Sequence, residues 1–151
     1  GGLILVETAG GPLSPCPSGT LFADMLRPLR FPGILVGSAE LGGITTTLCA
    51  KESLEVRGFD VPQVLVLESE SDPGTSLDNT DALREHLGAG ARVQRTQPIL
   101  QDEALSDWID RTAQDFDRLT ERLVNDHHQR FDEVASYKAD ALKHFWYPFT
   151  Q

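Results

Sequence analysis

The residues that decide the fold are 33–47, which read GILVGSAELGGITTT. They open with an apolar run that has no polar residue in alternation, which is typical of a strand buried on both faces of a parallel sheet. A glycine pair follows, and residues 44–57 then have helical spacing, with Gly58 placed to end the helix. A second apolar run at residues 64–67 completes a strand–helix–strand unit. We therefore predict an α/β fold.

Weaker signals extend this fold toward both ends of the chain. Residues 3–6 (LILV) form a third apolar run and predict another buried strand. Residues 10–30 are rich in Gly, Pro and Ser, and long aperiodic connections of this kind are usually functional. We expect a polar loop at residues 69–76, a short helix at 77–87 and a brief last strand at 91–93.

The last third of the chain has a different pattern. From Asp102 onward, apolar residues recur at helical spacing, with charged residues filling the other face. This pattern predicts one or two amphipathic helices, with a join near residues 125–128 and a second helix over 131–142. Pro148 is expected to end the pattern.

The composition excludes several classes of protein. The chain has 151 residues, 40% hydrophobic and 24% charged, as in an ordinary globular domain. No apolar run approaches the roughly 18 residues that cross a bilayer, so we expect no membrane partner. The net charge of −10 argues against a nucleic-acid partner, because that binding needs a positive surface.

The two cysteines and the first residue bear on the compartment. Cys16 and Cys49 are too few for a disulfide framework and indicate an intracellular protein. Cys49 lies within the predicted helix and is expected in the core. Because the chain starts with Gly1 at a strand-like run, we expect that sequence precedes it, and no targeting segment is visible.

The first place where chemistry is expected is the end of residues 3–6. There Glu7 is followed by Thr8, Ala9, Gly10 and Gly11. Ligands of open α/β sheets bind outside the carboxyl ends of strands, where a carboxylate can hold Mg²⁺ and a glycine turn lets N–H groups approach phosphate. The alternative is that Glu7 caps a helix and the glycines only form a turn. Spacing alone does not separate the two.

The second place is the start of the predicted helix at Ile44. Exposed N–H groups and the positive end of the helix dipole favour an anion there, and Thr45 and Thr46 add hydroxyl donors. The two turns together predict one pocket for metal and phosphates. If this segment is considered alone, however, the simpler interpretation is that its Gly and Thr residues only cap the helix.

Five segments are more specific together than alone: VETAGG (6–11), SPCPSGTL (14–21), GILVG (33–37), LGGI (41–44) and ESL (52–54) before Arg57. They resemble dethiobiotin synthetase, especially the form fused to diaminopelargonic acid aminotransferase in eukaryotes. The resemblance covers roughly residues 1–100. It implies the C-terminal half of a doubly wound, mostly parallel P-loop NTPase-like sheet, followed by an α-helical linker at 101–143.

The final residues, HFWYPFTQ at 144–151, resemble the opening of that aminotransferase. The resemblance implies that Trp146 and Phe149 recognise the substrate of a domain that uses pyridoxal phosphate (PLP). Some members carry Tyr where this chain has Phe149, which removes a hydroxyl group. Without the family, the segment is only an aromatic cluster that packs against another surface.

The resemblance implies an enzyme of biotin biosynthesis, a ligase that forms C–N bonds. Its reaction turns diaminopelargonic acid, CO₂ and ATP into dethiobiotin, ADP and phosphate, with Mg²⁺ on the phosphates. Small molecules are thus the implied partners, in a homodimer that is typically mitochondrial.

The same resemblance assigns roles to single residues. Glu7 matches the magnesium-binding glutamate. The nucleotide-binding positions are Glu7, Thr8, Ala9 and Gly10, with Pro98, Ile99 and Leu100 near an adenine-side loop. The positions that receive the substrate's carboxylate are Gly42, Gly43, Ile44 and Thr45.

Two other interpretations stay open. Another P-loop enzyme, such as an amide-forming synthetase or a partitioning-type ATPase, shares the doubly wound sheet. A non-catalytic interaction module would use the acidic helical region 102–143 to bind a partner, with the sheet as scaffold.

The sequence contains no G-x-x-x-x-G-K-[ST] phosphate loop, and the substrate-binding lysine that follows it in the family is absent, as is the PLP lysine. We therefore predict that the isolated 151-residue chain catalyses neither reaction. A phosphate-release assay with Mg²⁺ and ATP checks this, and ATP turnover by that chain would contradict it.

Overall fold

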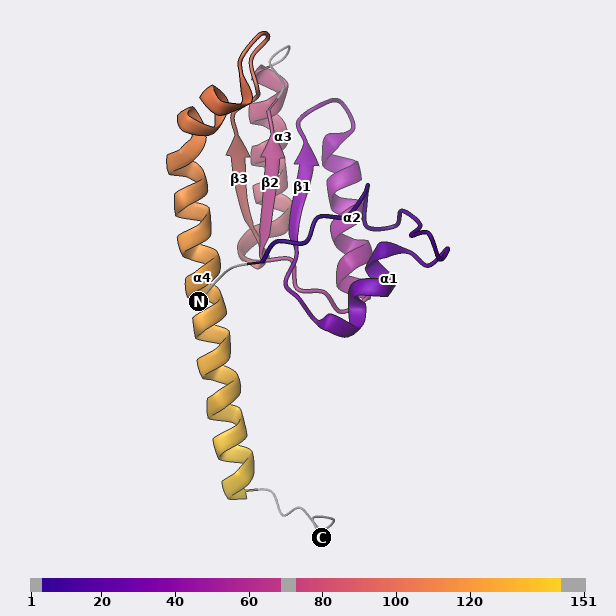
Figure 1. The fold of residues 1–151 in the computed structure, drawn as a ribbon, viewed down its shortest axis with the longest axis vertical. Helices are drawn as coiled ribbons and strands as arrows, with labels where there is room; N and C mark the ends of the chain where they lie inside the picture. The colour runs from indigo at the N-terminus through magenta and orange to yellow at the C-terminus, as the bar shows by residue number, and fades with distance from the viewer. Residues whose placement is uncertain (1–3, 69–72, 145–151) are drawn as a thin grey trace. The chain divides into compact units, whose positions relative to one another are not determined.

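The computed structural model describes residues 4–68 and 73–144 and divides the chain into two compact units, Gly1–Glu103 and Ala104–Gln151. Side chains of residues 73–78 are not described. The first unit contains α1 (Phe22–Leu26), η1 (Arg27–Leu29), β1 (Ile34–Ser38), α2 (Gly43–Val56), β2 (Gln63–Leu67), α3 (Pro73–Leu87), η2 (Gly88–Gly90) and β3 (Arg92–Thr96). The second contains α4 (Leu105–His144) (Figure 1).

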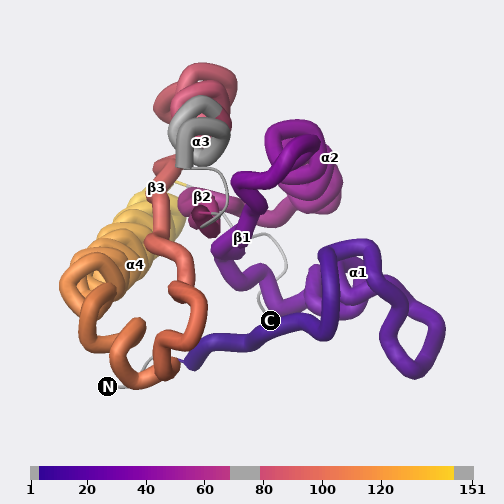
Figure 2. The backbone as a smooth tube through the Cα atoms, turned by 90° about the horizontal axis from the view of Figure 1, so that it is seen from above, coloured from indigo at the N-terminus to yellow at the C-terminus, as the bar shows by residue number. Residues whose placement is uncertain are grey.

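The three strands form one parallel sheet in the order β1-β2-β3. Neighbours in the sheet are also neighbours in the chain, and each crossover contains one α-helix in its described part. Because such crossovers are right-handed, successive helices of this order fall on the same face. Figure 2 shows α2 and α3 together on one side of the strands. The predicted α/β fold with a parallel sheet is confirmed.

The core lies between this face of the sheet and the two helices. Val64 and Val66 of β2 and Leu83 of α3 are completely buried, and Leu35 of β1 joins them. The prediction that every strand is buried on both faces holds for β2, where Gln63 through Val66 are all buried. It is wrong for β1, where Val36 is 55% exposed, because α2 covers only the Leu35 side.

The predicted strand at residues 3–6 is not a strand in the described part of the chain. Ile4, Leu5 and Val6 belong to no strand, and they are 86%, 73% and 60% exposed. Residue 3 lies outside the described residues. The segment runs along the face of the sheet opposite α2 and α3 (Figure 2). A strand needs a neighbour's N–H and C=O groups, and β1 pairs only with β2 here, so an apolar run alone did not suffice.

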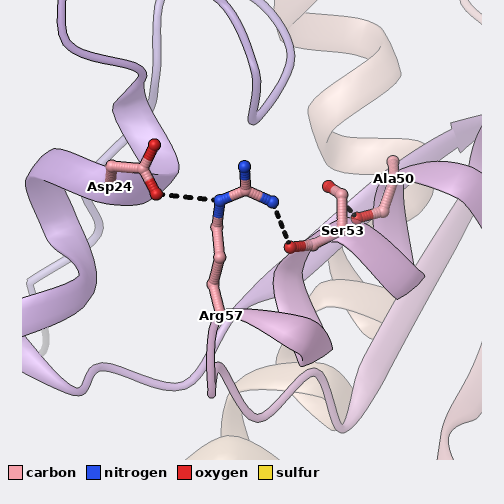
Figure 3. A network of polar contacts seen from close by, with 4 residues as sticks. All are labelled: Asp24, Ala50, Ser53 and Arg57. Atoms are coloured by element: carbon pink, nitrogen blue, oxygen red, sulfur yellow. Dashed lines mark hydrogen bonds and ion pairs between the residues drawn. The ribbon is translucent and has the colours of Figure 1, made fainter.

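The long connection at residues 10–30 is only partly irregular, since it contains α1 and η1. An ion pair fastens it to the end of α2. The Arg57 Nε donates to Asp24 Oδ1 over 2.9 Å, and its Nη1 donates to the Ser53 carbonyl over 2.8 Å (Figure 3). Five helical residues show no period, which is why the sequence did not reveal α1.

The remaining boundaries differ modestly from the predictions. The helix expected at residues 44–57 is α2, and the brief strand expected at 91–93 is the longer β3. The helix α3 begins at Pro73 rather than at residue 77, so part of the expected polar loop is helical. Proline fits the first helical turn because its missing N–H is not needed there. Residues 69–72 lie outside the described part.

The acidic last third forms one helix, α4, rather than two. Residues 125–128 are polar but include neither Gly nor Pro, so nothing in them stops a helix. Along α4, the hydroxyls of Thr112 and Thr120 donate to the carbonyls of Trp108 and Phe116, one turn earlier. Pro148 lies outside the described residues. No helix in the described part of the chain combines the length and apolar character needed to cross a membrane.

One glycine sets the distance between β1 and α2. A Cβ atom on Gly43 would lie 2.0 Å from the carbonyl oxygen of Ser38, so the first residue of α2 rests directly on the backbone at the end of β1. Overpacking a tight contact typically costs about 1–3 kcal/mol, and a backbone neighbour has little freedom to move.

We therefore expect Gly43→Ala to lower the free energy of unfolding by at least about 2 kcal/mol in urea titrations followed by circular dichroism. Gly90→Ala is the matched control, since a Cβ there meets nothing within 4 Å. Equal effects of the two substitutions would show that the close contact does not matter.

Candidate functional site

The turn between β1 and α2 presents backbone groups at the carboxyl edge of the sheet. The N–H of Glu40 donates to Ser38 Oγ over 3.1 Å, and the N–H of Gly43 donates to the Glu40 carbonyl over 2.8 Å. Gly42 has φ 87°, a left-handed conformation that suits glycine. Leu41 is fully exposed. These bonds hold the turn as a compact unit in front of α2.

A buried side chain from another helix supports the same turn. Asn79 of α3 is 7% exposed, and its Nδ2 donates to the carbonyls of Ala39 over 2.8 Å and of Glu40 over 3.2 Å. Sequence reasoning did not select Asn79, because it lies 39 and 40 positions away from its partners and in no motif. Only the packing of α3 against α2 brings it there.

Two N–H groups in the first turn of α2 have no backbone acceptor in the described part of the chain. Among the described residues, the backbone N–H groups of Ile44 and Thr45 donate to no backbone oxygen, whereas the N–H of Thr46 reaches Gly42. The two predicted hydroxyl donors, Thr45 and Thr46, differ in their hydrogen bonds. Both are exposed, but Thr46 Oγ1 donates to the carbonyls of Gly42 and Gly43 and so is not a free donor. The arrangement can bind an anion through N–H groups and the helix dipole.

The second predicted turn follows Glu7. Thr8 closes it, since its carbonyl accepts from the Gly10 N–H over 2.9 Å and its Oγ1 donates to the Gly10 carbonyl over 2.8 Å. Gly10 has φ 102°, and a Cβ on it would lie 2.6 Å from Ser14 Oγ. Glu7 and Ala9 are exposed. The turn thus leaves the Glu7 carboxylate accessible, although no strand delivers it.

This turn lines a cavity of about 350 Å³ on the first unit. Glu7, Thr8 and Gly10 form one side, and the other side comes from α1, β1 and the end of α2. The main apolar contributors are Ala23, Leu26, Phe31, Leu35, Leu54 and Phe59. Residues 41–45 are not among the lining. The structure therefore does not place the two predicted turns in one cavity.

A shallower groove of about 540 Å³ lies between the loop at residues 11–15 and α2. Residues 11–15 form one wall, and Thr46, Cys49 and Ser53 contribute to the other. Cys49, expected in the core, is exposed here, because its position on α2 faces away from the sheet; Cys16 is the buried cysteine. Gly11 lines both this groove and the cavity beside Glu7.

The remaining predicted positions lie elsewhere. Pro98, Ile99 and Leu100 follow the carboxyl end of β3, the same edge of the sheet as the β1–α2 turn. The Leu100 N–H donates to Glu103 Oε2 over 2.9 Å, and Ile99 is about half exposed. Trp146 and Phe149 lie outside the described residues.

The metal-binding potential of the described residues is limited. No three His, Cys, Asp or Glu side chains in the described ranges gather to hold a metal ion. Mg²⁺ keeps several waters and commonly takes one or two carboxylates together with substrate phosphates. The accessible Glu7 carboxylate fits such a role, in which the phosphates supply the other oxygens.

Comparison with known proteins shows which family shares this sequence. No family model matches the chain. It is 40% identical over 151 residues to the mitochondrial bifunctional dethiobiotin synthetase/7,8-diamino-pelargonic acid aminotransferase of Arabidopsis thaliana, which covers 99% of this chain. It is 36% identical over 170 residues to the bifunctional dethiobiotin synthetase/adenosylmethionine-8-amino-7-oxononanoate aminotransferase of Emericella nidulans, again over 99% of this chain.

The chain spans only part of these relatives, 17% of the Arabidopsis protein and 20% of the Emericella protein. A protein named for one activity also matches: the ATP-dependent dethiobiotin synthetase of Brucella ovis is 35% identical over 99 residues, 66% of this chain and 43% of its own length. Nearly the whole of this chain is therefore similar to one segment of the bifunctional dethiobiotin synthetase/diaminopelargonic acid aminotransferases.

Proposed function

We propose that this chain is part of an ATP- and Mg²⁺-dependent dethiobiotin synthetase that acts in biotin biosynthesis. Its reaction closes the ureido ring of dethiobiotin from 7,8-diaminopelargonic acid and CO₂, with ATP as the energy source. The relatives that align with 99% of the chain support this, because both names combine synthetase and aminotransferase. The name of the Brucella protein supports the use of ATP.

One observation carries the substrate side of the proposal: two N–H groups in the first turn of α2 donate to no backbone oxygen among the described residues. Diaminopelargonic acid is a zwitterion with a carboxylate at the far end of an alkyl chain. The N–H groups of Ile44 and Thr45, which donate to no backbone oxygen, offer that carboxylate two donors, and the α2 dipole adds favourable electrostatics. Gly42 and Gly43 complete the proposed site. A Cβ at Gly42 would meet nothing within 4 Å, which leaves room for the carboxylate to approach the backbone there. In this role the turn positions the substrate and takes no part in proton transfer.

The nucleotide side is proposed for the other turn. Glu7 would supply a carboxylate to Mg²⁺, which when bound neutralises phosphate charge as the γ-phosphate is transferred. Thr8, Ala9 and Gly10 would contact the nucleotide through the backbone. Pro98, Ile99 and Leu100 are the proposed adenine-side contacts. Their place beyond β3 supports this, since nucleotides bind at the carboxyl edge of such sheets.

The rest of the proposal concerns the catalytic motifs that residues 1–151 do not contain and the division of the chain into domains. The phosphate loop and the PLP lysine would come from other sequence, so this chain alone is proposed to be inactive. Residues 1–100 are proposed as synthetase, 101–143 as a helical linker and 144–151 as the start of the aminotransferase, with Trp146 and Phe149 in its substrate pocket. The boundary between the compact units at Glu103 and Ala104 supports the first division.

Location and assembly complete the proposal for the whole protein. The Arabidopsis relative is named as mitochondrial, and we propose the same location. We also propose a homodimer, on the strength of the family resemblance alone.

Removing the Glu7 carboxylate tests the nucleotide side. In the bifunctional protein that carries this sequence, we expect Glu7→Ala to raise the KM for MgATP by at least about tenfold, because one oxygen ligand of the metal is lost. Dethiobiotin formation across a Mg²⁺ titration measures it. Glu121→Gln, an exposed acid of α4, is the control. Unchanged MgATP binding and turnover in Glu7→Ala would contradict the proposed role of Glu7 as a metal ligand.

A second test uses the acid beside the proposed carboxylate site. Glu40 is exposed and lies within the turn that leads into α2, so its charge opposes an incoming carboxylate. We expect Glu40→Gln to lower the KM for diaminopelargonic acid roughly twofold at low salt, with a smaller effect at high salt because the charges are screened. Glu52→Gln, farther along α2, should leave the KM unchanged. A KM that rises in Glu40→Gln would contradict the proposed placement of the carboxylate.

A further inference from the structure

We propose that Asn79 is the positioning residue of the substrate-carboxylate site: its side chain orients the two peptide groups that precede α2 so that the N–H groups of the turn face the ligand. This inference rests on the proposed function. Asn79 does not touch the substrate itself. Its role is carried by the bonds that it makes to the turn from a different helix.

The geometry of the peptide group gives the first step. The carbonyls of Ala39 and Glu40 both accept from Asn79 Nδ2. In a planar trans peptide the C=O and the following N–H point in opposite directions. Fixing the Ala39 carbonyl therefore fixes the Glu40 N–H, which donates to Ser38 Oγ. Fixing the Glu40 carbonyl likewise turns the Leu41 N–H away from Asn79.

The second step is electrostatic. Two carbonyl oxygens so close to a bound carboxylate would repel it if they were free to rotate toward it. The Asn79 amide satisfies both of them, and the Glu40 carbonyl accepts a second bond from the Gly43 N–H. The negative ends of these dipoles are thereby held on the interior side, and the N–H ends remain for the anion.

The third step is packing. Asn79 is 7% exposed, and its Nδ2 lies 3.5 Å from the point where a Cβ on Gly43 would be. Its neighbour Leu83, one turn later on α3, is completely buried in the core. The amide is therefore held by the core rather than by solvent, and a buried donor in a fixed place orients its acceptors more strictly than a surface side chain does.

The test replaces Asn79 in the bifunctional protein. Asn79→Asp keeps the shape, removes both donors and places a carboxylate against two carbonyls. We expect the KM for diaminopelargonic acid to rise about tenfold, with the KM for ATP within about twofold of wild type. Asn79→Ala should act in the same direction if the aspartate variant fails to fold. Glu85→Gln, an exposed residue of the same helix, is the control.

A modified substrate separates positioning from a general structural effect. With the methyl ester of diaminopelargonic acid, which lacks the charged carboxylate, the penalty of Asn79→Asp should largely disappear. Hydrogen exchange of the backbone N–H groups of Glu40 and Gly43, which are hydrogen-bonded within the turn, should also become faster in the variant, whether or not the protein is active.

The outcomes are distinct. An unchanged KM for the acid, an equal loss for acid, ester and ATP, or failure of every Asn79 variant to fold would each overturn the inference. A wild-type bifunctional protein that forms no dethiobiotin would overturn the proposed function instead. In that case unchanged hydrogen exchange in the variant would overturn the structural role of Asn79 as well.

Discussion

The contact between Gly43 and the Ser38 carbonyl is the constraint on which the rest of the structure depends. It brings the first turn of α2 against the end of β1, with no room for a side chain at the crossing. From that point α2 can run back along the sheet and pack Ile44, Leu48 and Leu54 on the core. The same contact aims the N-terminus of α2 at the carboxyl edge. Fold and candidate site therefore share one steric requirement.

The local charge at this edge differs from the charge of the whole chain. A net charge of −10 disfavours long polyanions, which are bound through an extended positive surface. A single carboxylate needs only a few well-placed donors, and backbone N–H groups at a helix start provide them without any basic side chain. The acidic composition and an anion site are compatible because the net charge acts over long distances, whereas the N–H donors act at contact. Salt screens the long-range repulsion more than it weakens hydrogen bonds at contact.

The two turns proposed to bind substrate and nucleotide are not held equally well by hydrogen bonds and packing. The β1–α2 turn is held by bonds from Ser38 and Asn79 and by the close contact at Gly43. The Glu7 turn closes only on itself through Thr8, and the described residues before it are exposed and belong to no strand. The first turn is thus defined by the sheet and its helices. The second takes its position from a segment that makes no backbone ladder with β1 among the described residues.

Local patterns in the sequence were enough to identify β1, α2 and β2, because each is a run of 5 to 14 residues whose period or apolar character is set by its own neighbours. They also pointed to the glycine turn before α2. They failed for residues 3–6, since an apolar run says nothing about whether a partner strand lies beside it. They also failed for Cys49, whose side of the helix depends on what α2 packs against. Asn79 shows the limit most clearly: its role comes from hydrogen bonds across about 40 positions, which exist only once α3 has packed beside α2.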